Sequence, residues 1–176
     1  MVEPLQTNRL NLRPCQIGDL DPVHSLWTHP EVRRFLFDDR AIDRQEARTF
    51  IEGSLDSFTT KGYGIWVCFE KNSDRLAGFS GLLQFSPEQP PSLIFGLHPH
   101  FWGRGYAQEA ANSILRYAFE ELNLEKIIAD ADEPNRASIR VLNALGFCQL
   151  NSAIANERPL LYYEMRREHW QNRDVL

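Results

Sequence analysis

Two glycines one residue apart, Gly103 and Gly105, stand where an apolar strand pattern gives way to a helical one. The first N–H groups of a helix have no intrahelical acceptor, and the helix dipole places partial positive charge beside them. Because glycine carries no Cβ, an anion can approach this backbone closely, and Arg104 adds a charged donor at the rim. The spacing predicts a phosphate-binding loop for a nucleotide or coenzyme, with a plain tight turn as the alternative.

A second candidate for chemistry is Ser138, in a short helical segment. Asn135 suits the N-cap of this helix, and Gly146 suits a left-handed cap at its end. Ser138 falls on the same helical stripe as Leu142 and Leu145, which turns its hydroxyl inward. The hydroxyl either bonds back to the carbonyl one turn earlier or takes part in a reaction.

Other side chains could transfer protons, but their spacing in the sequence assigns a catalytic role to none of them. His98 and His100 lie in a turn before the glycine loop, where solvated imidazoles are expected. By position, the candidates for a general base are three carboxylates, Glu88, Asp130 and Glu157. The sequence does not choose among them.

Regular patterns on both sides of the glycine loop predict the elements that position it. A strand over 93–97 precedes the loop, a helix begins near Gly105, and a strand over 126–131 follows. A helical crossover of this length joins parallel neighbours. The chemistry is therefore expected at the end of a mixed sheet.

The rest of the chain supplies further elements. A strand is expected at 10–13, helices capped by Asp19 or Asp21 and by Asp43, a hairpin of 65–70 and 76–83, and a last strand at 160–166. Between the two helices, Val32 and Phe35 are expected to fill the core. Tyr163 of the last strand either faces the active cleft or packs within the sheet.

Length and composition favour a single domain spanning residues 1–176. A chain of 176 residues buries roughly 70% of its unfolded surface in one core. A net charge of −5 gives no general attraction to nucleic acid. No stretch resembles a membrane span or a secretory signal, so a cytoplasmic location is expected.

The cysteines argue against a disulfide framework and against a metal site. Cys15, Cys68 and Cys148 are odd in number, far apart and without CxxC spacing. We expect them to be small core residues, and we expect no metal.

Two common phosphate-binding motifs do not fit the loop. A dinucleotide fingerprint needs glycine at position 108, which is Gln108, and a P-loop needs Gly-Lys-Ser/Thr. The segment Trp102-Gly103-Arg104-Gly105-Tyr106-Ala107 instead resembles the acetyl-CoA loop of the GCN5-related N-acetyltransferases (GNAT superfamily). Residues 7–14 resemble the opening strand of its RimJ/RimL-like branch of ribosomal-protein N-acetyltransferases, and residues 135–147 resemble the second family motif.

This resemblance implies a fold and a cosubstrate. The implied GNAT fold is α/β (α+β), with a single mixed central sheet whose parallel strands four and five, at 93–97 and 126–131, splay apart and are flanked by helices. The pantetheine arm of acetyl-CoA lies in the gap. The implied contacts are the backbone of Leu97, the loop residues Trp102, Gly103, Arg104, Gly105, Tyr106 and Ala107, and the side chain of Asn135.

The resemblance also implies acetyl transfer to a primary amine, of a protein N-terminus or a small molecule, by direct attack in a ternary complex. Ser138 becomes the candidate that protonates the departing thiolate, because Leu142 stands where many relatives have a tyrosine. The missing tyrosine and the unassigned base leave an alternative, a CoA-binding module without turnover. The expected partners are acetyl-CoA and the amine, with the chain a monomer or homodimer.

Overall fold

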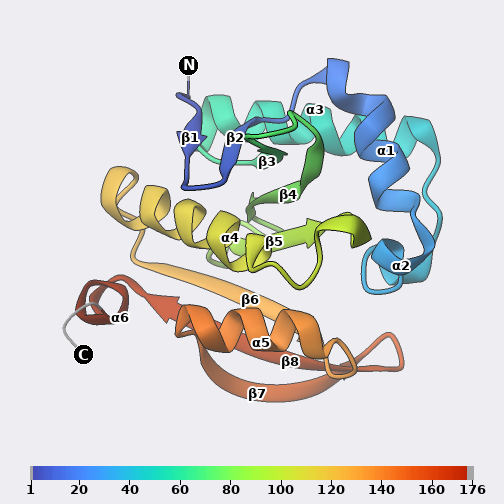
Figure 1. Cartoon of the computed structure of the whole chain (residues 1–176). Coiled ribbons are helices and arrows are strands. Elements are labelled where there is room, and N and C mark those ends of the chain that lie inside the picture. Colours follow the sequence, from blue (N-terminus) through green and yellow to red (C-terminus); the bar gives the residue numbers. More distant parts are fainter. Residues whose placement is uncertain (1, 174–176) are drawn as a thin grey trace.

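The computed structural model describes residues 2–173, which form one open sheet of eight strands in the order β1-β2-β3-β4-β5-β6-β8-β7 (Figure 1). The strands are β1 (Leu5–Gln6), β2 (Leu10–Pro14), β3 (Ile65–Glu70), β4 (Leu76–Leu83), β5 (Ser92–Leu97), β6 (Lys126–Asp132), β7 (Cys148–Ala155) and β8 (Arg158–Arg166). All neighbouring pairs are antiparallel except β5 and β6, which are parallel. The expected mixed sheet is confirmed.

Helices cover both faces of the sheet. They are α1 (Leu20–Thr28), α2 (Pro30–Arg33), α3 (Arg44–Lys61), α4 (Tyr106–Arg116), α5 (Arg136–Leu145) and α6 (Arg167–Asn172), with short 3-10 turns η1 (Ile17–Asp19), η2 (Phe37–Asp39) and η3 (Pro99–Phe101). A π-helical turn, η4 (Tyr117–Glu121), extends α4. Within residues 2–173, no helix combines the length and apolarity that crossing a bilayer requires.

Two hydrophobic cores lie on opposite faces of the sheet, because side chains alternate along each strand. In β3, Ile65 and Val67 pack with α1 and α3, and we call this cluster the α1–α3 core. Trp66 and Cys68 face the other way and pack with α4 and α5, in the α4–α5 core. Burial on both faces explains why β3 reads as a continuous apolar run.

The parallel strands separate soon after they meet. Their only paired position is Ser92 with Ile128, at the start of β5. Beyond it, the backbones of β5 and β6 form no ladder in the described structure. The expected splay is confirmed, and the open strand edges face each other across what we call the β5–β6 gap.

The N-terminal region departs from the expected details. Asp43 caps α3 as predicted, accepting from the N–H of Glu46 at 2.8 Å. Asp19 does not cap α1 with its side chain; it forms an ion pair with Arg13, with an N–O distance of 2.7 Å. Val32 packs on the α1–α3 core, whereas Phe35 does not belong to it. The prediction for Phe35 was wrong because the chain turns at η2 and sends Leu36 and Phe37 inward instead.

The C-terminal region also corrects one expectation. Cys15 and Cys68 are buried, but Cys148 is exposed at the start of β7. This strand lies at the sheet edge, where no further strand covers it. Tyr163 packs in the α4–α5 core and is 1% exposed, and its hydroxyl has no hydrogen-bond partner among the described residues.

Candidate active site

The glycine loop has the geometry that an anion site requires. Gly103 and Gly105 adopt left-handed φ angles of 72° and 77°, and α4 begins directly after them. In the described structure, no backbone N–H of residues 103–107 has a hydrogen-bond acceptor. A Cβ at Gly103 would meet nothing within 4 Å, and one at Gly105 only a nitrogen of Arg9 at 3.5 Å. The space beside both glycines is therefore open to a ligand.

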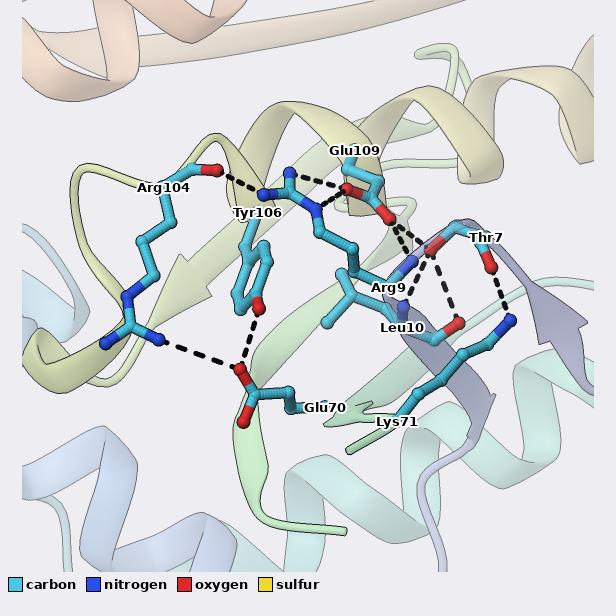
Figure 2. A network of polar contacts seen from close by, with 8 residues as sticks. All are labelled: Thr7, Arg9, Leu10, Glu70, Lys71, Arg104, Tyr106 and Glu109. Carbon is cyan, nitrogen blue, oxygen red and sulfur yellow. Dashed lines mark hydrogen bonds and ion pairs between the residues drawn. The ribbon is translucent and has the colours of Figure 1, made fainter. Parts of the chain in front are cut away.

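A polar network ties this loop to β2 and β3 (Figure 2). The carbonyl oxygen of Arg104 accepts from Nη1 of Arg9 at 2.7 Å. The guanidinium of Arg104 lies 3.6 Å from a carboxylate oxygen of Glu70, to which the Tyr106 hydroxyl also donates at 2.7 Å. Arg104 thus points toward the end of β3, and its expected contact with phosphate stays a prediction.

Glu109, in the first turn of α4, holds the network together (Figure 2). One oxygen accepts from the Thr7 hydroxyl at 2.6 Å and from the backbone N–H of Arg9 at 2.7 Å. The other accepts from Nε of Arg9 at 2.6 Å. Burial alone would raise the Glu109 pKa, but these hydrogen bonds outweigh it and lower the pKa.

The other loop residues fix the end of β5 and the start of α4. The indole Nε1 of Trp102 donates to the carbonyl of Leu97 at 2.9 Å, while much of its ring remains exposed. Tyr106 is buried, and the Arg9 guanidinium lies over its ring at 4.4 Å. Ala107 packs against the α4–α5 core.

Leu97 presents its backbone to the β5–β6 gap. It is in register with Gly78, while the next residue, His98, donates its N–H to Ala77 of β4 at 2.8 Å. Because bonded and non-bonded pairs alternate in an antiparallel ladder, the N–H and C=O of Leu97 point away from β4. The bond from Trp102 to its carbonyl agrees with this orientation. The Leu97 N–H is therefore available as a donor at the gap.

Ser138 and Asn135 form a pair at the start of α5. Oδ1 of Asn135 accepts from the Ser138 N–H at 3.2 Å, which confirms the N-cap, and Nδ2 donates to the Ser138 hydroxyl oxygen at 2.9 Å. The structure records no bond from this hydroxyl to a carbonyl one turn earlier, within residues 2–173. Ser138 is half-buried rather than in the core, whereas Leu142 is 1% exposed. The Ser138 proton is free to be donated to a ligand.

His98 is less solvated than expected, whereas His100 is exposed as expected. His98 is half-buried. The centre of its ring lies 5.3 Å from the ring centre of His29, the residue that joins α1 to α2. Burial, together with repulsion from neighbouring cations, lowers the pKa of His98. Its Nδ1 accepts from the N–H of His100 at 3.2 Å.

The network around Glu109 was not predicted from the sequence. Arg9 and Glu109 are separated by 100 positions, and no local pattern links them. A signal was nevertheless present, because Thr7 and Arg9 belong to the segment resembling the family's opening strand and Glu109 follows the loop motif directly.

Comparison with known proteins agrees with this geometry. The Acetyltransferase (GNAT) domain family matches residues 9–148. An uncharacterized N-acetyltransferase, p20, of Bacillus licheniformis is 31% identical over 147 residues, covering 83% of each chain. The FsC-acetyl coenzyme A-N(2)-transacetylase of Aspergillus fumigatus is 29% identical, covering 94% of this chain and 77% of its own.

A solved structure of RimL, a ribosomal L7/L12 alpha-N-protein acetyltransferase, in complex with coenzyme A, has the same fold. It superposes with a TM-score of 0.81 and is 15% identical, covering 95% of this chain and 99% of that one. The two chains therefore share a fold. The chain belongs to the GNAT acetyltransferase family, whose members use acetyl-CoA, and it is an acyltransferase.

Proposed function

We propose that the protein transfers the acetyl group of acetyl-CoA to a primary amine in a ternary complex. The observation that carries this proposal is the glycine loop, with unpaired N–H groups, lying beside the open edge of β5. The loop would hold the pyrophosphate at residues 103–107, and the N–H of Leu97 would donate to the thioester carbonyl. The pantetheine arm would lie in the β5–β6 gap, with the Asn135 side chain nearby.

In this function Ser138 assists the leaving group. Asn135 occupies the Ser138 oxygen as an acceptor and leaves the hydroxyl proton free. A hydrogen bond from this hydroxyl to the sulfur strengthens as negative charge develops, so it favours the transition state over the ground state. Leu142 is buried and apolar, so it cannot take this role.

Two kinds of acceptor agree with the relatives. RimL is named for the α-amine of a ribosomal protein, and the Aspergillus enzyme for a nitrogen of FsC. A protein N-terminus and a small amine therefore both belong in an acceptor panel. The resemblance of residues 7–14 and 102–107 supports a place in the RimJ/RimL-like branch.

The second candidate is a CoA-binding module without turnover. The observation that favours it is the absence of a tyrosine at Leu142, where many relatives carry the acid. The two functions are separated by measuring the release of free CoA in the presence of the acceptor panel. An enzyme cleaves acetyl-CoA and releases CoA, whereas a binding module leaves acetyl-CoA intact.

Binding is tested by calorimetry with CoA on three variants. Gly105→Val forces a branched side chain into the left-handed conformation and into the space beside the loop, so CoA binding should be lost. Gly105→Asn also adds a side chain, but asparagine adopts a left-handed φ more readily than valine does. This variant therefore tests the loop even if the valine variant does not fold. Gly53→Val places the same valine on the exposed face of α3 and should bind CoA normally.

Thermal unfolding accompanies each titration, to establish that each variant is folded. Unchanged CoA affinity in a folded Gly105→Asn protein would contradict the loop assignment. Binding by the wild type without acetyl transfer to any amine of the panel would favour the module.

A further inference from the structure

The proposed reaction needs a group that removes a proton from the acceptor ammonium. The carboxylate of Glu88 is exposed between β4 and β5, and a hydrogen bond from Ser86 lowers its pKa, which weakens it as a base. Glu157 lies in the turn between β7 and β8, with a left-handed φ of 64°. The lone pair on Nδ1 of His98 is occupied by the His100 N–H, so its neutral ring carries the proton on Nε2. Glu88 and His98 are thus weakened as bases, and Glu157 lies in the β7–β8 hairpin, which is separated from the gap by β6 in the strand order.

Asp130 has a different position. Ala129 and Ala131 on either side of it are buried in the α4–α5 core, so alternation along β6 turns Asp130 to the opposite face of the sheet. It lies two residues beyond Ile128, the last position at which β6 pairs with β5. Its carboxylate therefore stands where the β5–β6 gap opens, on the face that carries α1 and α3.

The surroundings leave this carboxylate without a partner. Asp132 is paired with Arg158 at 3.4 Å, whereas Asp130 makes no hydrogen bond or ion pair with any residue in 2–173. Burial and repulsion from Asp132 raise the pKa of Asp130. The side chain is nevertheless accessible to solvent. One side of the carboxylate faces water, while the protein around its other sides supplies the burial that raises the pKa.

Other elements bring few charges to this place. In the described structure, Asp130 is flanked by Asp132 on the same strand and by Tyr162, its cross-strand neighbour on β8. Arg158 of β8 and Asp38 of η2 lie at Asp132, and Asp38 reaches Arg158 at 4.0 Å. From α2, the carbonyl of Arg34 accepts from Arg158 at 3.1 Å. Arg158 thus interacts with Asp38, Asp132 and the Arg34 carbonyl. It does not neutralise Asp130, so the Asp130 carboxylate can attract a cation from solvent.

We propose that Asp130 is the general base that deprotonates the acceptor ammonium, an inference that rests on the acetyl transfer proposed above. Ser138 belongs to α5, which covers one face of the sheet (Figure 1). The alternation along β6 places Asp130 on the other face. Asp130 and Ser138 thus lie on opposite sides of the β5–β6 gap. This arrangement suits a reaction in which the amine attacks the thioester from the Asp130 side and the thiolate leaves on the Ser138 side.

The proposed step forms a C–N bond and breaks the C–S bond of the thioester. The Asp130 carboxylate takes one proton from R–NH₃⁺, and the freed lone pair forms a C–N bond with the thioester carbonyl carbon. When the C–S bond breaks, the electron pair goes to sulfur. A second nitrogen proton passes through the Ser138 hydroxyl to the thiolate, which gives CoA-SH and the N-acetyl amine. Asp130 then returns its proton to solvent, so one proton is released for each turnover.

The test combines steady-state kinetics with thermal unfolding of Asp130→Asn. The wild type is first assayed by CoA release against an acceptor panel of a peptide N-terminus and small primary amines. Loss of a general base should lower kcat by about 10²-fold at neutral pH. The wild-type kcat should fall on the acid side as Asp130 is protonated, and this limb should be absent in the variant. Asp130→Glu, which retains a carboxylate, should recover part of the rate.

A second readout does not depend on activity. Folding raises the Asp130 pKa, so its ionised form is less favourable in the folded than in the unfolded protein, and stability is lost as pH rises through that pKa. Removing the charge with Asn should therefore raise the Tm at pH 7 while it slows catalysis. Glu88→Gln removes a charge from an exposed carboxylate outside the gap and should leave kcat unchanged.

The outcomes separate the two proposals. If the wild type transfers acetyl and Asp130→Asn keeps its kcat and acid limb, the base assignment is wrong and the proposed function stands. If only KM rises, Asp130 binds the ammonium without taking its proton, which also overturns the assignment. If the wild type acetylates no amine of the panel, both proposals fall together.

Discussion

The Arg9–Glu109 pair permits a quantitative prediction about the network behind the glycine loop. In Glu109→Gln, the amide oxygen can still accept from the Thr7 hydroxyl and the Arg9 N–H. The amide nitrogen, however, faces Nε and Nη2 of Arg9, both 2.6 Å from the present carboxylate oxygen. The variant therefore loses two charge-assisted contacts while it keeps the size of the side chain.

The magnitude follows from these two contacts. Hydrogen bonds to charged groups contribute about 1.5–3 kcal/mol each, and solvent screening reduces this because the Arg9 side chain is 40% exposed. We expect a loss of about 2–3 kcal/mol in the free energy of unfolding. For a chain of this length, about 2–4 °C per kcal/mol gives a Tm lowered by about 4–12 °C.

The matched control is Glu46→Gln. Glu46 also lies in the first turn of a helix, so the interaction with the helix dipole is lost equally in both variants. Its partner Arg40 is 2.7 Å away, but both side chains are far more exposed. A surface pair of this kind contributes about 0–1 kcal/mol, so its Tm should fall by at most about 4 °C. Equal Tm losses in the two variants would refute the reasoning.

The pH dependence supplies an independent check. The folded-state pKa of Glu109 lies below its ordinary value of 4.5, so its stabilisation is complete above that value and is lost as pH falls through the folded-state pKa. The Tm difference between wild type and Glu109→Gln should therefore be largest near neutral pH and shrink in acid. A constant difference down to strongly acidic pH would contradict the origin assigned to it.

Two further predictions concern single side chains. Ser138→Ala should lower kcat by about 10²-fold with little change in the dissociation constant of acetyl-CoA, measured by calorimetry, because its contact strengthens only in the transition state. Unchanged turnover would contradict its role as a donor to sulfur. Cys148 alone should react with a thiol reagent in the folded protein, since burial raises the pKa of Cys15 to about 12 and that of Cys68 further. Rapid labelling of a second cysteine would contradict the described packing.

Short sequence patterns correctly predicted the strands and helix caps that depend on interactions between neighbouring residues. The strands around the glycine loop and the caps at Asn135 and Gly146 were expected from residues close together in the chain, whereas the splay of the parallel pair was expected only from the family resemblance. Cap chemistry and side-chain alternation act over a few residues, so they can be read without a structure.

The errors arose where a side chain had a competing partner or where distant segments meet. Asp19 has the side chain of a helix cap, but its two oxygens accept from the Arg13 guanidinium and from the N–H of Gln16 rather than from the first turn of α1. Cys148 was expected in the core, although the edge position of its strand depends on the order of the whole sheet. The candidate base is a similar case, because the sequence cannot show which of three carboxylates faces the gap without a partner.

The exposed ring of Trp102 gives this protein a natural optical probe. Of the four tryptophans, Trp27, Trp66 and Trp170 are at most 8% exposed, while Trp102 is 48% exposed and held beside the glycines by its bond to the Leu97 carbonyl. Its emission should lie to the red of the buried three, and a dissolved quencher such as iodide should reach it selectively. Fluorescence would then report on occupancy of the loop in the unlabelled protein, at concentrations well below those that calorimetry requires.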